Sequence, residues 1–449
     1  MLKGLSVTEV SLSEVLKTSI MRIESEFYNS EKMVYPYCKK GKDIIVFSQY
    51  GTSKDLNEVS LGYPVLRLNE YNQSFISEPA KYCNLIDEQT YNQLKLKKGD
   101  VLICRTNGNP KYVGKSALVM KDYEYAFASY LFRVRPNVSL ISPAALVAFL
   151  NSKFGRIEIE RYSMVSNQAN FSPAKFREIN IPILPDTVVK TIDRLMEDAF
   201  MSLENSEALY NVAQQELVDI LGLQGFEEDS STYSVQPFKS SFLASGRLDA
   251  EYYRPKYDNL IKYLRTLPYS TIGELATIQK SVEPGSKVYQ EEGIPFIRVQ
   301  DLTKFGITES DIHLPEKEFA KVIRPQKDTI LMSKDGSVGI AYKMEQDSNC
   351  ITSGAILHLK LKDKRVLPDY FTLVLNSIVV GLQAERDAGG SIIQHWKPSE
   401  IENVIIPILS IDKQKELSEK IQQSFNLRKE SLRLQKEAKE LVEKTIAEA

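Results

Sequence analysis

Polar and basic side chains gather in one glycine-containing stretch of the sequence, CRTNGNPKYVG, which spans residues 104–114. Arginine can donate two parallel hydrogen bonds to guanine, asparagine can pair with adenine, and lysine and tyrosine can reach phosphates. The wider segment 95–121 holds seven basic residues against a single acid, Asp100. This composition predicts a loop that binds nucleic acid, although a solvated hairpin is the alternative interpretation for any one of its residues. The candidate contacts are Arg105, Thr106, Asn107, Asn109, Lys111, Tyr112 and Lys115.

A second group of polar residues stands beside an aromatic residue in the stretch SNQANFSP, residues 166–173. Gln168 and Asn170 are its candidate contacts, and Phe171 is expected to anchor the loop in the core. Two stretches of the same kind occur in the second half of the chain, SKDGSVG at 333–339 and SIIQHWKP at 391–398. The candidate contacts in this half are Ser333, Lys334, Asp335, Ser337, Gln394 and His395.

Catalytic and metal-binding patterns are missing from the sequence. It contains no GxGxxG after a strand, no GxxxxGK[ST], no GxSxG and no HExxH. The four cysteines and three histidines show no zinc spacing, and no CxxC pair suggests a disulfide or redox motif. The formal net charge of −2 gives no basic signature for the whole chain, but net charge averages over different surfaces. We therefore predict a binding protein with no catalytic residues and no metal site.

The chain contains an internal repeat, first visible in the tetrapeptide IPIL at 181–184 and again at 406–409, 225 residues later. At the same shift RIESEFY, starting at Arg22, falls on RLDAEYY, starting at Arg247. GDVLICRTNG also matches KDTILMSKDG, with a slightly different shift that loop insertions would explain. An ordered series of matches indicates a duplicated module rather than chance. The polar loops differ between the copies while their flanking strands agree, as expected for two binding modules with different targets.

Each copy begins with a mixed α+β domain of roughly 185 residues, on the order of one typical domain. YPVLRL and IPFIRV read as buried strands, and DVLIC and DTILM as strands that run into a glycine turn. SPAALVAFLNSKFG and LPDYFTLVLNSIVVG read as short helices with proline near the start.

Each copy then continues into a proline-free segment, residues 186–222 and 411–447. Apolar positions recur there in steps of three, four and seven, which predicts one long helix with a single apolar stripe. Two such helices can pair as an antiparallel coiled coil, or each can pack on its own domain. About 36 residues at about 1.5 Å per residue would make a spacer of roughly 54 Å. The residues expected to pair are Ile192, Met196, Phe200, Leu217, Leu417, Ile421, Phe425 and Val442.

The predicted order is two tandem domains, each followed by its long helix. The boundaries are 1–185 for the first domain, 186–224 for the first helix, 225–409 for the second domain and 410–449 for the second helix. No run of about 18 apolar residues predicts a transmembrane helix, and the start of the chain lacks the apolar stretch of a secretory signal. Together with the scattered cysteines, this predicts a cytoplasmic protein.

The chain resembles the specificity subunits of type I restriction–modification systems. RIESEFY and RLDAEYYRP, the two strand-to-glycine turns, and the stretches FSPAKFREINIPIL and WKPSEIENVIIPIL carry this resemblance over nearly the whole length. It implies two target-recognition domains, each reading half of a split site in double-stranded DNA, with two paired helices that set the gap. It also implies two methyltransferase subunits that use S-adenosylmethionine, an optional pair of restriction subunits that use ATP and Mg, and a prokaryotic host. The subunit itself would hold no cofactor.

Three alternatives remain at this level. A related targeting subunit of another phage-defence complex would have the same fold, and the neighbouring genes would distinguish it. A stand-alone enzyme would turn over substrate without a partner. A protein-binding scaffold would show no salt-dependent affinity for DNA.

Overall fold

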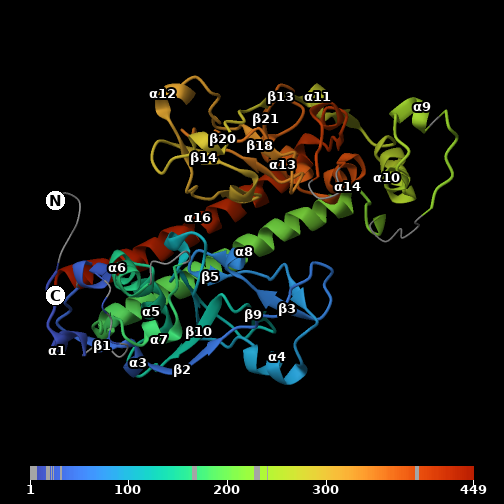
Figure 1. The fold of residues 1–449 in the computed structure, drawn as a ribbon. Helices are drawn as coiled ribbons and strands as arrows, with labels where there is room; N and C mark the ends of the chain where they lie inside the picture. The colour runs from blue at the N-terminus through green and yellow to red at the C-terminus, as the bar shows by residue number, and fades with distance from the viewer. Residues whose placement is uncertain are drawn as a thin grey trace. The chain divides into compact units, whose positions relative to one another are not determined.

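The chain folds into two compact units, Met1–Glu204 with Leu427–Ala449 (unit 1) and Asn205–Asn426 (unit 2). The computed structural model describes residues 8–16, 21, 23, 25–30, 33–163, 169–226, 233–239, 241–389 and 394–449 (Figure 1). The boundary passes through both long helices, α8 (Asp186–Ile220) and α16 (Ile411–Ala447), so each unit contains part of each helix. The division into four consecutive segments follows the order along the chain instead and stays a prediction.

Unit 1 is built on a six-stranded sheet with the order β2-β10-β7-β8-β5-β4. A three-stranded sheet, β6-β3-β9, and a two-stranded pair, β1-β11, complete it. Helix α5 packs against β8 and β10 of the large sheet (Figure 1). The strands are β1 (Cys38–Lys40), β2 (Ile45–Tyr50), β3 (Tyr63–Leu66), β4 (Tyr71–Asn72), β5 (Phe75–Ile76), β6 (Tyr82–Cys83), β7 (Val101–Cys104), β8 (Ser116–Leu118), β9 (Ala126–Phe127), β10 (Leu131–Pro136) and β11 (Asn180–Pro182). The shorter helices are α1 (Leu12–Val15), α2 (Ser25–Asn29), α3 (Gly41–Ile44), α4 (Glu88–Leu94), α5 (Pro143–Leu150), α6 (Lys153–Tyr162) and α7 (Pro173–Phe176).

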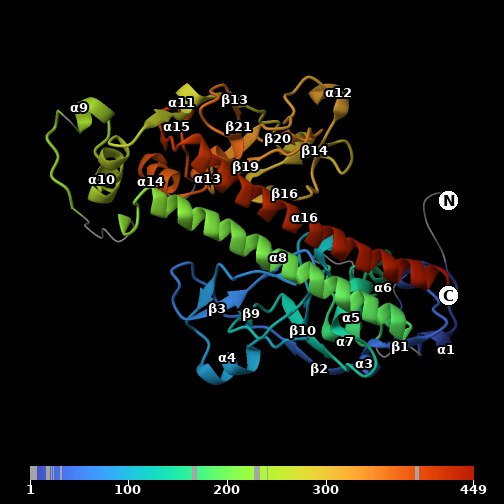
Figure 2. The same cartoon turned by 180° about the vertical axis from the view of Figure 1, so that it is seen from behind.

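Unit 2 repeats this plan. Its sheets are β13-β21-β18-β19, β17-β14-β20, β12-β22 and β15-β16, and α13 packs on β19 (Figure 2). The strands are β12 (Tyr269–Thr271), β13 (Ala276–Lys280), β14 (Ile294–Ile297), β15 (Leu302–Thr303), β16 (Gly306–Ile307), β17 (His313–Leu314), β18 (Ile330–Ser333), β19 (Ala341–Lys343), β20 (Ile351–Thr352), β21 (Ile356–Leu361) and β22 (Ile405–Pro407). The shorter helices are α9 (Phe242–Ser245), α10 (Pro255–Leu264), α11 (Ile272–Leu275), α12 (Glu316–Phe319), α13 (Pro368–Leu375), α14 (Ile378–Asp387) and α15 (Pro398–Ile401).

The two units share the same connectivity, which confirms the mixed helix-and-sheet repeat. The central strands β2-β10-β7-β8 correspond in order to β13-β21-β18-β19, and the parallel pair β3-β9 corresponds to β14-β20. The Ile-Pro of each repeated IPIL ends the last strand of its unit, β11 or β22, which pairs antiparallel with the first strand of the same unit, β1 or β12. This pairing closes each unit, because it joins the beginning of a domain to the point where its long helix starts.

The segment predicted as one short helix in each copy is in fact two helices. In unit 1 the break falls at Asn151 and Ser152, where the Ser152 hydroxyl caps α6 by accepting a hydrogen bond from the Gly155 amide. The side-chain amide of Asn151 bonds both backbone groups of Ser116 on β8. It accepts from the Ser116 N–H at 3.0 Å and donates to the Ser116 carbonyl at 2.8 Å. Asn376 bonds Ala341 on β19 in the same way, at 3.0 and 2.7 Å. A helix continuing through these positions would leave the two strands without these partners.

The apolar stripes of the long helices are buried in each unit. In unit 1 the core includes Ile192, Met196 and Val442, while Phe200 is half-buried with its ring 5.4 Å from that of Phe75. In unit 2 Leu217, Leu417 and Ile421 are buried, while Phe425 is half-buried beside Phe305. Each long helix therefore buries part of its stripe in each unit, so neither helix packs on its own preceding domain alone.

Within unit 2 the two helices run antiparallel. Ser206 of α8 contacts Ser424 of α16, where the Ser424 hydroxyl donates to the Ser206 carbonyl at 2.7 Å. Further along α8, Glu216 pairs at 2.9 Å with Lys420, which precedes Ser424 in α16. Rising residue numbers in one helix thus meet falling numbers in the other. Both serines are fully buried, and small side chains at this point let the helix backbones approach closely.

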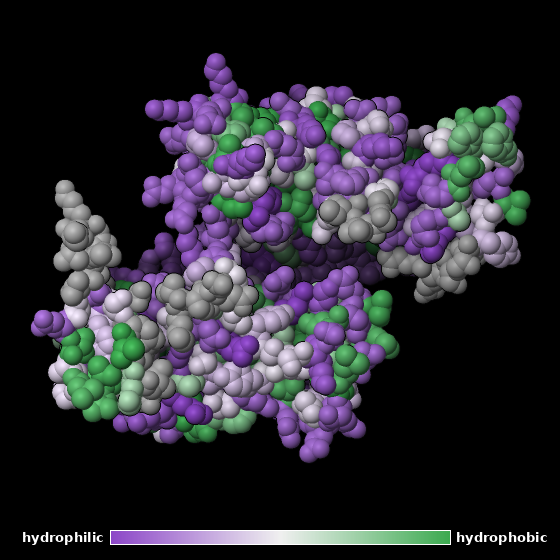
Figure 3. All heavy atoms as spheres, viewed as in Figure 1, coloured by the Kyte–Doolittle hydropathy of each residue, from purple (hydrophilic) through white to green (hydrophobic). Residues whose placement is uncertain are grey.

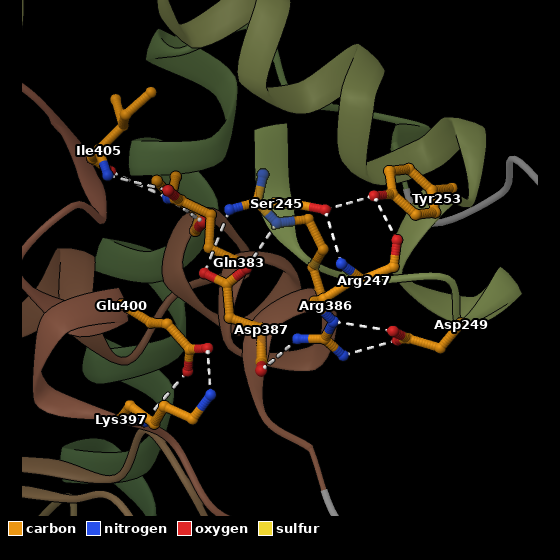
Figure 4. Close-up of polar contacts among 11 residues, drawn as sticks. Ser245, Arg247, Asp249, Tyr253, Gln383, Arg386, Asp387, Lys397, Glu400 and Ile405 are labelled. Carbon is orange, nitrogen blue, oxygen red and sulfur yellow. Dashed lines mark hydrogen bonds and ion pairs between the residues drawn. The ribbon is translucent and has the colours of Figure 1, made fainter. Parts of the chain in front are cut away.

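The motif that begins each copy (RIESEFY in unit 1, RLDAEYY in unit 2) contacts a short helix of its own unit, α6 or α14. In unit 2 the guanidinium groups of Arg247 and Arg386 lie 4.4 and 5.2 Å from the centre of the Tyr252 ring. Arg247 also donates to the Asp387 carbonyl at 2.9 Å, and Arg386 pairs with the Asp387 carboxylate at 2.7 Å (Figure 4). A cation over an aromatic face is favourable where water is partly excluded.

The corresponding residues of unit 1 make the same kind of contact between an arginine and an aromatic ring. Arg161 lies 4.4 Å from the centre of the Phe27 ring and donates to the Phe27 carbonyl at 3.3 Å. Arg22 and Glu24 of the first motif lie outside the described residues. The repeat of an aromatic residue in RIESEFY and RLDAEYY is thus explained by its arginine partner on α6 or α14.

Apolar side chains also gather at the surface around α9, in the segment that precedes this motif in unit 2 (Figure 3). Phe238 and Phe242 stack there with ring centres 5.5 Å apart, and Leu243 is exposed. Among the described residues, no helix is long and apolar enough to cross a membrane.

One buried position differs in charge between the copies. Gln383 on α14 accepts from the Ile405 amide at 2.8 Å and donates to the Ile405 carbonyl at 2.9 Å, so it bonds both backbone groups of one residue of β22 (Figure 4). The equivalent residue in unit 1 is Glu158, which is fully buried and accepts a hydrogen bond from the Asn180 amide at 3.0 Å. Its second oxygen has no hydrogen-bond partner among the described residues. Burial raises the pKa of the Glu158 carboxyl, because the charged form loses its hydration.

We predict that Glu158→Gln stabilises unit 1 by about 1 kcal/mol at pH 8, because the amide can donate to the strand as Gln383 does. A carboxyl whose pKa is raised by folding contributes stability at low pH. That contribution falls as the pH rises from the unfolded value, about 4.3, through the folded one. The gain from glutamine should therefore be small near pH 4 and larger at pH 8. Hydrogen exchange of the β11 amides, measured across this range, reports it.

The reverse change, Gln383→Glu, is the matched control and should destabilise unit 2 by about 1–3 kcal/mol at pH 8, because a buried carboxylate then faces a carbonyl. A Glu158→Gln gain that is equal at every pH would contradict the prediction.

Candidate nucleic-acid interface

The polar turn of unit 1 begins directly after the buried strand β7 and closes on itself. The Gly114 amide donates to the Cys104 carbonyl at 2.8 Å, and the Cys104 amide donates to the Lys115 carbonyl at 2.9 Å. Gly114 has φ +82°, and a Cβ there would stand 2.5 Å from the Ile159 side chain, so this position requires glycine. Asn107 accepts from the Asn109 amide at 2.8 Å, and Asn109 accepts from the Lys111 amide at 3.0 Å. Each asparagine thus uses its oxygen to shape the turn.

The structure brings the second predicted stretch of unit 1 beside this turn. Thr106 and Asn170 form an antiparallel bridge, and the Phe171 amide donates to the Arg105 carbonyl at 2.8 Å. Phe171 is fully buried, as expected for a core anchor. Lys175 donates to the Asn170 carbonyl at 2.7 Å. Gln168 lies outside the described residues. Residues 104–116 and 169–171 are called the loop pair of unit 1 below.

Unit 2 holds its two stretches with the same backbone contacts. Asp335 and His395 form the antiparallel bridge, and the amide of the buried Trp396 donates to the Lys334 carbonyl at 2.8 Å. The Gly336 amide donates to the Gln394 carbonyl at 2.9 Å. Residues 333–340 and 394–396 are called the loop pair of unit 2. In each unit the backbone N–H of the buried aromatic residue donates to the carbonyl of the first residue after the central strand, β7 or β18.

The side chains on this shared backbone differ between the units. In unit 1, Lys111 and Lys115 are exposed, and Arg105, Thr106, Asn107, Asn109, Tyr112 and Asn170 are half-buried. In unit 2, Ser337, Gln394 and His395 are exposed, and Lys334 and Asp335 pair with each other. Ser333 is fully buried, and its hydroxyl accepts from the Ile340 amide at 2.9 Å. Ser333 therefore shapes the turn, and we do not include it among the proposed contacts.

The positive charge around the first loop pair is smaller than the sequence indicated. Lys97 pairs at 3.0 Å with Asp122, just beyond the basic segment. Lys95 pairs in the same way with Glu124, and Lys121 pairs with Glu204 of α8. Local composition missed these acids because two follow the segment directly and the third comes from a distant helix. Of the remaining basic residues of the segment, Arg105, Lys111 and Lys115 lie in the loop pair and Lys98 lies outside it.

Residues that the sequence did not single out extend this surface of unit 1. The Arg105 guanidinium lies 5.3 Å from the centre of the Tyr50 ring, on the outer strand β2 of the large sheet. Its Nε atom is buried and has no hydrogen-bond partner among the described residues. Arg177 donates to the Ser48 hydroxyl of β2 at 3.0 Å. No local pattern could have identified these residues, because β2 reaches the turn only through the sheet.

Two reactive side chains on the central strands, Cys104 of β7 and His358 of β21, are buried. Burial raises the pKa of the Cys104 thiol to about 12, so it is not a nucleophile at neutral pH. Burial lowers the pKa of His358 to about 4, and its Nε2 lies 2.8 Å from the Thr352 hydroxyl. Within the described part of the chain, no group of histidine, cysteine and acidic residues could hold a metal ion. The geometry favours recognition by hydrogen bonds and charge.

Known proteins similar to the chain share one description. A family model described as the type I restriction modification DNA specificity domain matches residues 9–207 and 267–440. The putative type I restriction enzyme MjaX specificity subunit of Methanocaldococcus jannaschii is 23% identical over 90% of this chain and 89% of its own length. The type I restriction enzyme EcoKI specificity subunit of Escherichia coli is 29% identical over 29% of this chain and 27% of its own.

A solved structure described as the type I restriction–modification system S subunit from M. genitalium aligns with 93% of this chain and 98% of its own. It has 14% identity and a TM-score of 0.39, a likeness too distant to carry an argument. The family model, by contrast, matches well over half of the residues, once in each repeat. The chain therefore belongs to the family of type I restriction–modification DNA specificity subunits, which recognise DNA and are not themselves the catalytic subunits.

Proposed function

We propose that each unit reads one half of a two-part site in double-stranded DNA, through its own loop pair. The observation that carries this proposal is the shared backbone of the two loop pairs, which presents different polar side chains in each unit. A constant backbone fixes where the side chains stand, and different side chains then select different bases. Two unlike readers in one chain favour an asymmetric site, since both must bind at one spacing to combine their affinities.

The side chains of the loop pairs suit the major groove. Arg105 can donate to guanine, the Asn107 and Asn170 amides can pair with adenine, and Lys111 and Lys115 can contact phosphates. Tyr112 lies beside Lys115, whose ammonium is 4.1 Å from the ring centre. The proposed contacts of unit 1 are Arg105, Thr106, Asn107, Asn109, Lys111, Tyr112, Lys115 and Asn170. Those of unit 2 are Lys334, Asp335, Ser337, Gln394 and His395.

We further propose that the long helices set the number of unread base pairs and dock two methyltransferase subunits. This is supported by the continuity of α8 and α16, each of which contributes to both units. The methyltransferase subunits would hold S-adenosylmethionine, and restriction subunits, where present, would hold ATP and Mg. The site of action would be the prokaryotic cytoplasm, where the DNA is.

We predict that Arg105→Ala relaxes only the half-site read by unit 1, and that Lys334→Ala relaxes only the other half. Loss of one base contact should weaken binding about 5-fold to 100-fold at the affected position, from 1–3 kcal/mol per contact. The measurements are methylated-base mapping in cells and salt-dependent DNA binding by the complex with its methyltransferase partner.

Lys98→Ala is the matched control, because Lys98 is exposed and lies outside both loop pairs. It should leave both half-sites unchanged. Equal damage to both halves by a single loop variant would contradict the assignment of one half-site to each unit. If no methylation motif depends on the chain, the same fold would instead target another phage-defence effector.

We also predict that removing one heptad from each long helix, around Ser206 and Ser424, changes the tolerated gap and preserves both half-site sequences. The two serines are in contact, so matched deletions keep the pairing of the flanking apolar residues in register. The half-sites serve as the internal control in the same methylation map. An unchanged gap would remove the spacer role from the helices.

A further inference from the structure

His395 is held by its backbone on two sides while its side chain stays exposed. Its amide donates to the Gly389 carbonyl at 2.7 Å, and the Gly389 amide donates back at 3.2 Å. On its other side the residue bridges Asp335, and the next residue is the buried Trp396. Nevertheless, 64% of the His395 side chain is exposed. A rigid backbone carrying an exposed polar ring is the arrangement expected of a recognition residue.

The neighbours of the ring determine which of its nitrogens carries a proton. His395 Nδ1 lies 2.8 Å from the Asp335 carboxylate, which is paired with the Lys334 ammonium through its other oxygen. An ionised carboxylate can only accept hydrogen bonds, so Nδ1 must be the donor. The neutral ring then has no proton on Nε2, which is left as an acceptor. Nε2 has no partner among the described residues.

The equivalent residue of unit 1 has a different capacity. Asn170 occupies the same place in its loop pair, between the bridge to Thr106 and the buried Phe171. Its side-chain amide has no hydrogen-bond partner in the described part of the chain and offers both a donor and an acceptor. The shared backbone thus presents the Asn170 amide in unit 1, which can both donate and accept, and His395 Nε2 in unit 2, which can only accept while the ring is neutral.

We propose that His395 Nε2 determines one base of the half-site read by unit 2, by accepting a hydrogen bond from an exocyclic amino group in the major groove. This inference rests on the proposed function. In the major groove, amino donors are carried by adenine at N6 and by cytosine at N4, while guanine and thymine present acceptors. Asp335 acts as the positioning residue for His395, because its carboxylate sets the tautomer of the ring.

The test uses the full chain in complex with its methyltransferase partner, on duplexes carrying the site identified by methylation mapping. Each adenine or cytosine of the unit 2 half-site, apart from the methylated adenine, is replaced in turn by an analogue lacking the amino group. At one position, we expect this replacement to weaken binding of the wild-type complex at pH 8 about fivefold to tenfold, the range of one hydrogen bond.

The variant His395→Ala completes the cycle. It should lose most of the sensitivity at that position, to below about twofold, because the acceptor is gone. The analogue also weakens base pairing, but this background is equal for the two proteins and cancels in the comparison. Replacements in the unit 1 half-site are the internal control and should have equal effects on both proteins.

The variant Asp335→Asn tests the tautomer separately from the contact. A carboxamide can donate to Nδ1, which allows the proton to move to Nε2 and makes it a donor. At the position identified above, guanine or thymine should then be tolerated within about threefold of the original base, on the scale of one hydrogen bond.

Sequence-specific binding in which no amino group couples to His395 would overturn the inference and leave the proposed function standing. An Asp335→Asn complex that keeps the original preference would overturn the tautomer assignment. If the wild-type complex shows no sequence-specific binding at all, the proposed function itself is wrong.

Discussion

The geometry of each loop pair depends on one backbone hydrogen bond, made by the amide of a buried aromatic residue to the first carbonyl after the central strand. Phe171 makes it to Arg105, and Trp396 makes it to Lys334. The aromatic ring cannot leave the core without exposing a large apolar surface, so the bond fixes the two polar segments side by side. The residues on either side are then free to vary in type, since the backbone and the ring hold the position.

Side chains of the surrounding helices hold the strands in place through hydrogen bonds that only particular residue types can make. Asn151 and Asn376 each bond both backbone groups of one strand residue, and only a side chain with a donor and an acceptor can do so. Gln383 holds the final strand of unit 2 in a similar way. At the same place in unit 1, one oxygen of Glu158 has no hydrogen-bond partner among the residues that the structure describes. The two units thus share a fold, but this buried position is ionisable only in unit 1.

The fold was largely predictable, because duplication supplied two independent samples of every pattern. Apolar periodicity indicated the long helices nearly to their ends, and the repeated IPIL marked the last strand of each unit. Periodicity could not show the break after Leu150, because the residues beyond it continue the apolar spacing, while the Asn151 side chain at the helix end bonds the backbone of Ser116 on a distant strand. The local composition also overestimated the positive charge of segment 95–121, because acidic residues outside the segment neutralise part of it.

The sequence by itself determined that the chain has two similar modules with unlike polar turns, because strand, turn and helix signals are local in the chain. Only the tertiary structure decided which turns meet and what each side chain can still bind. The pairing of Thr106 with Asn170 and of Asp335 with His395 joins residues more than 50 positions apart. Ser333 and His395 illustrate the result, since one polar side chain is used up inside its turn and the other is left exposed with one nitrogen still available.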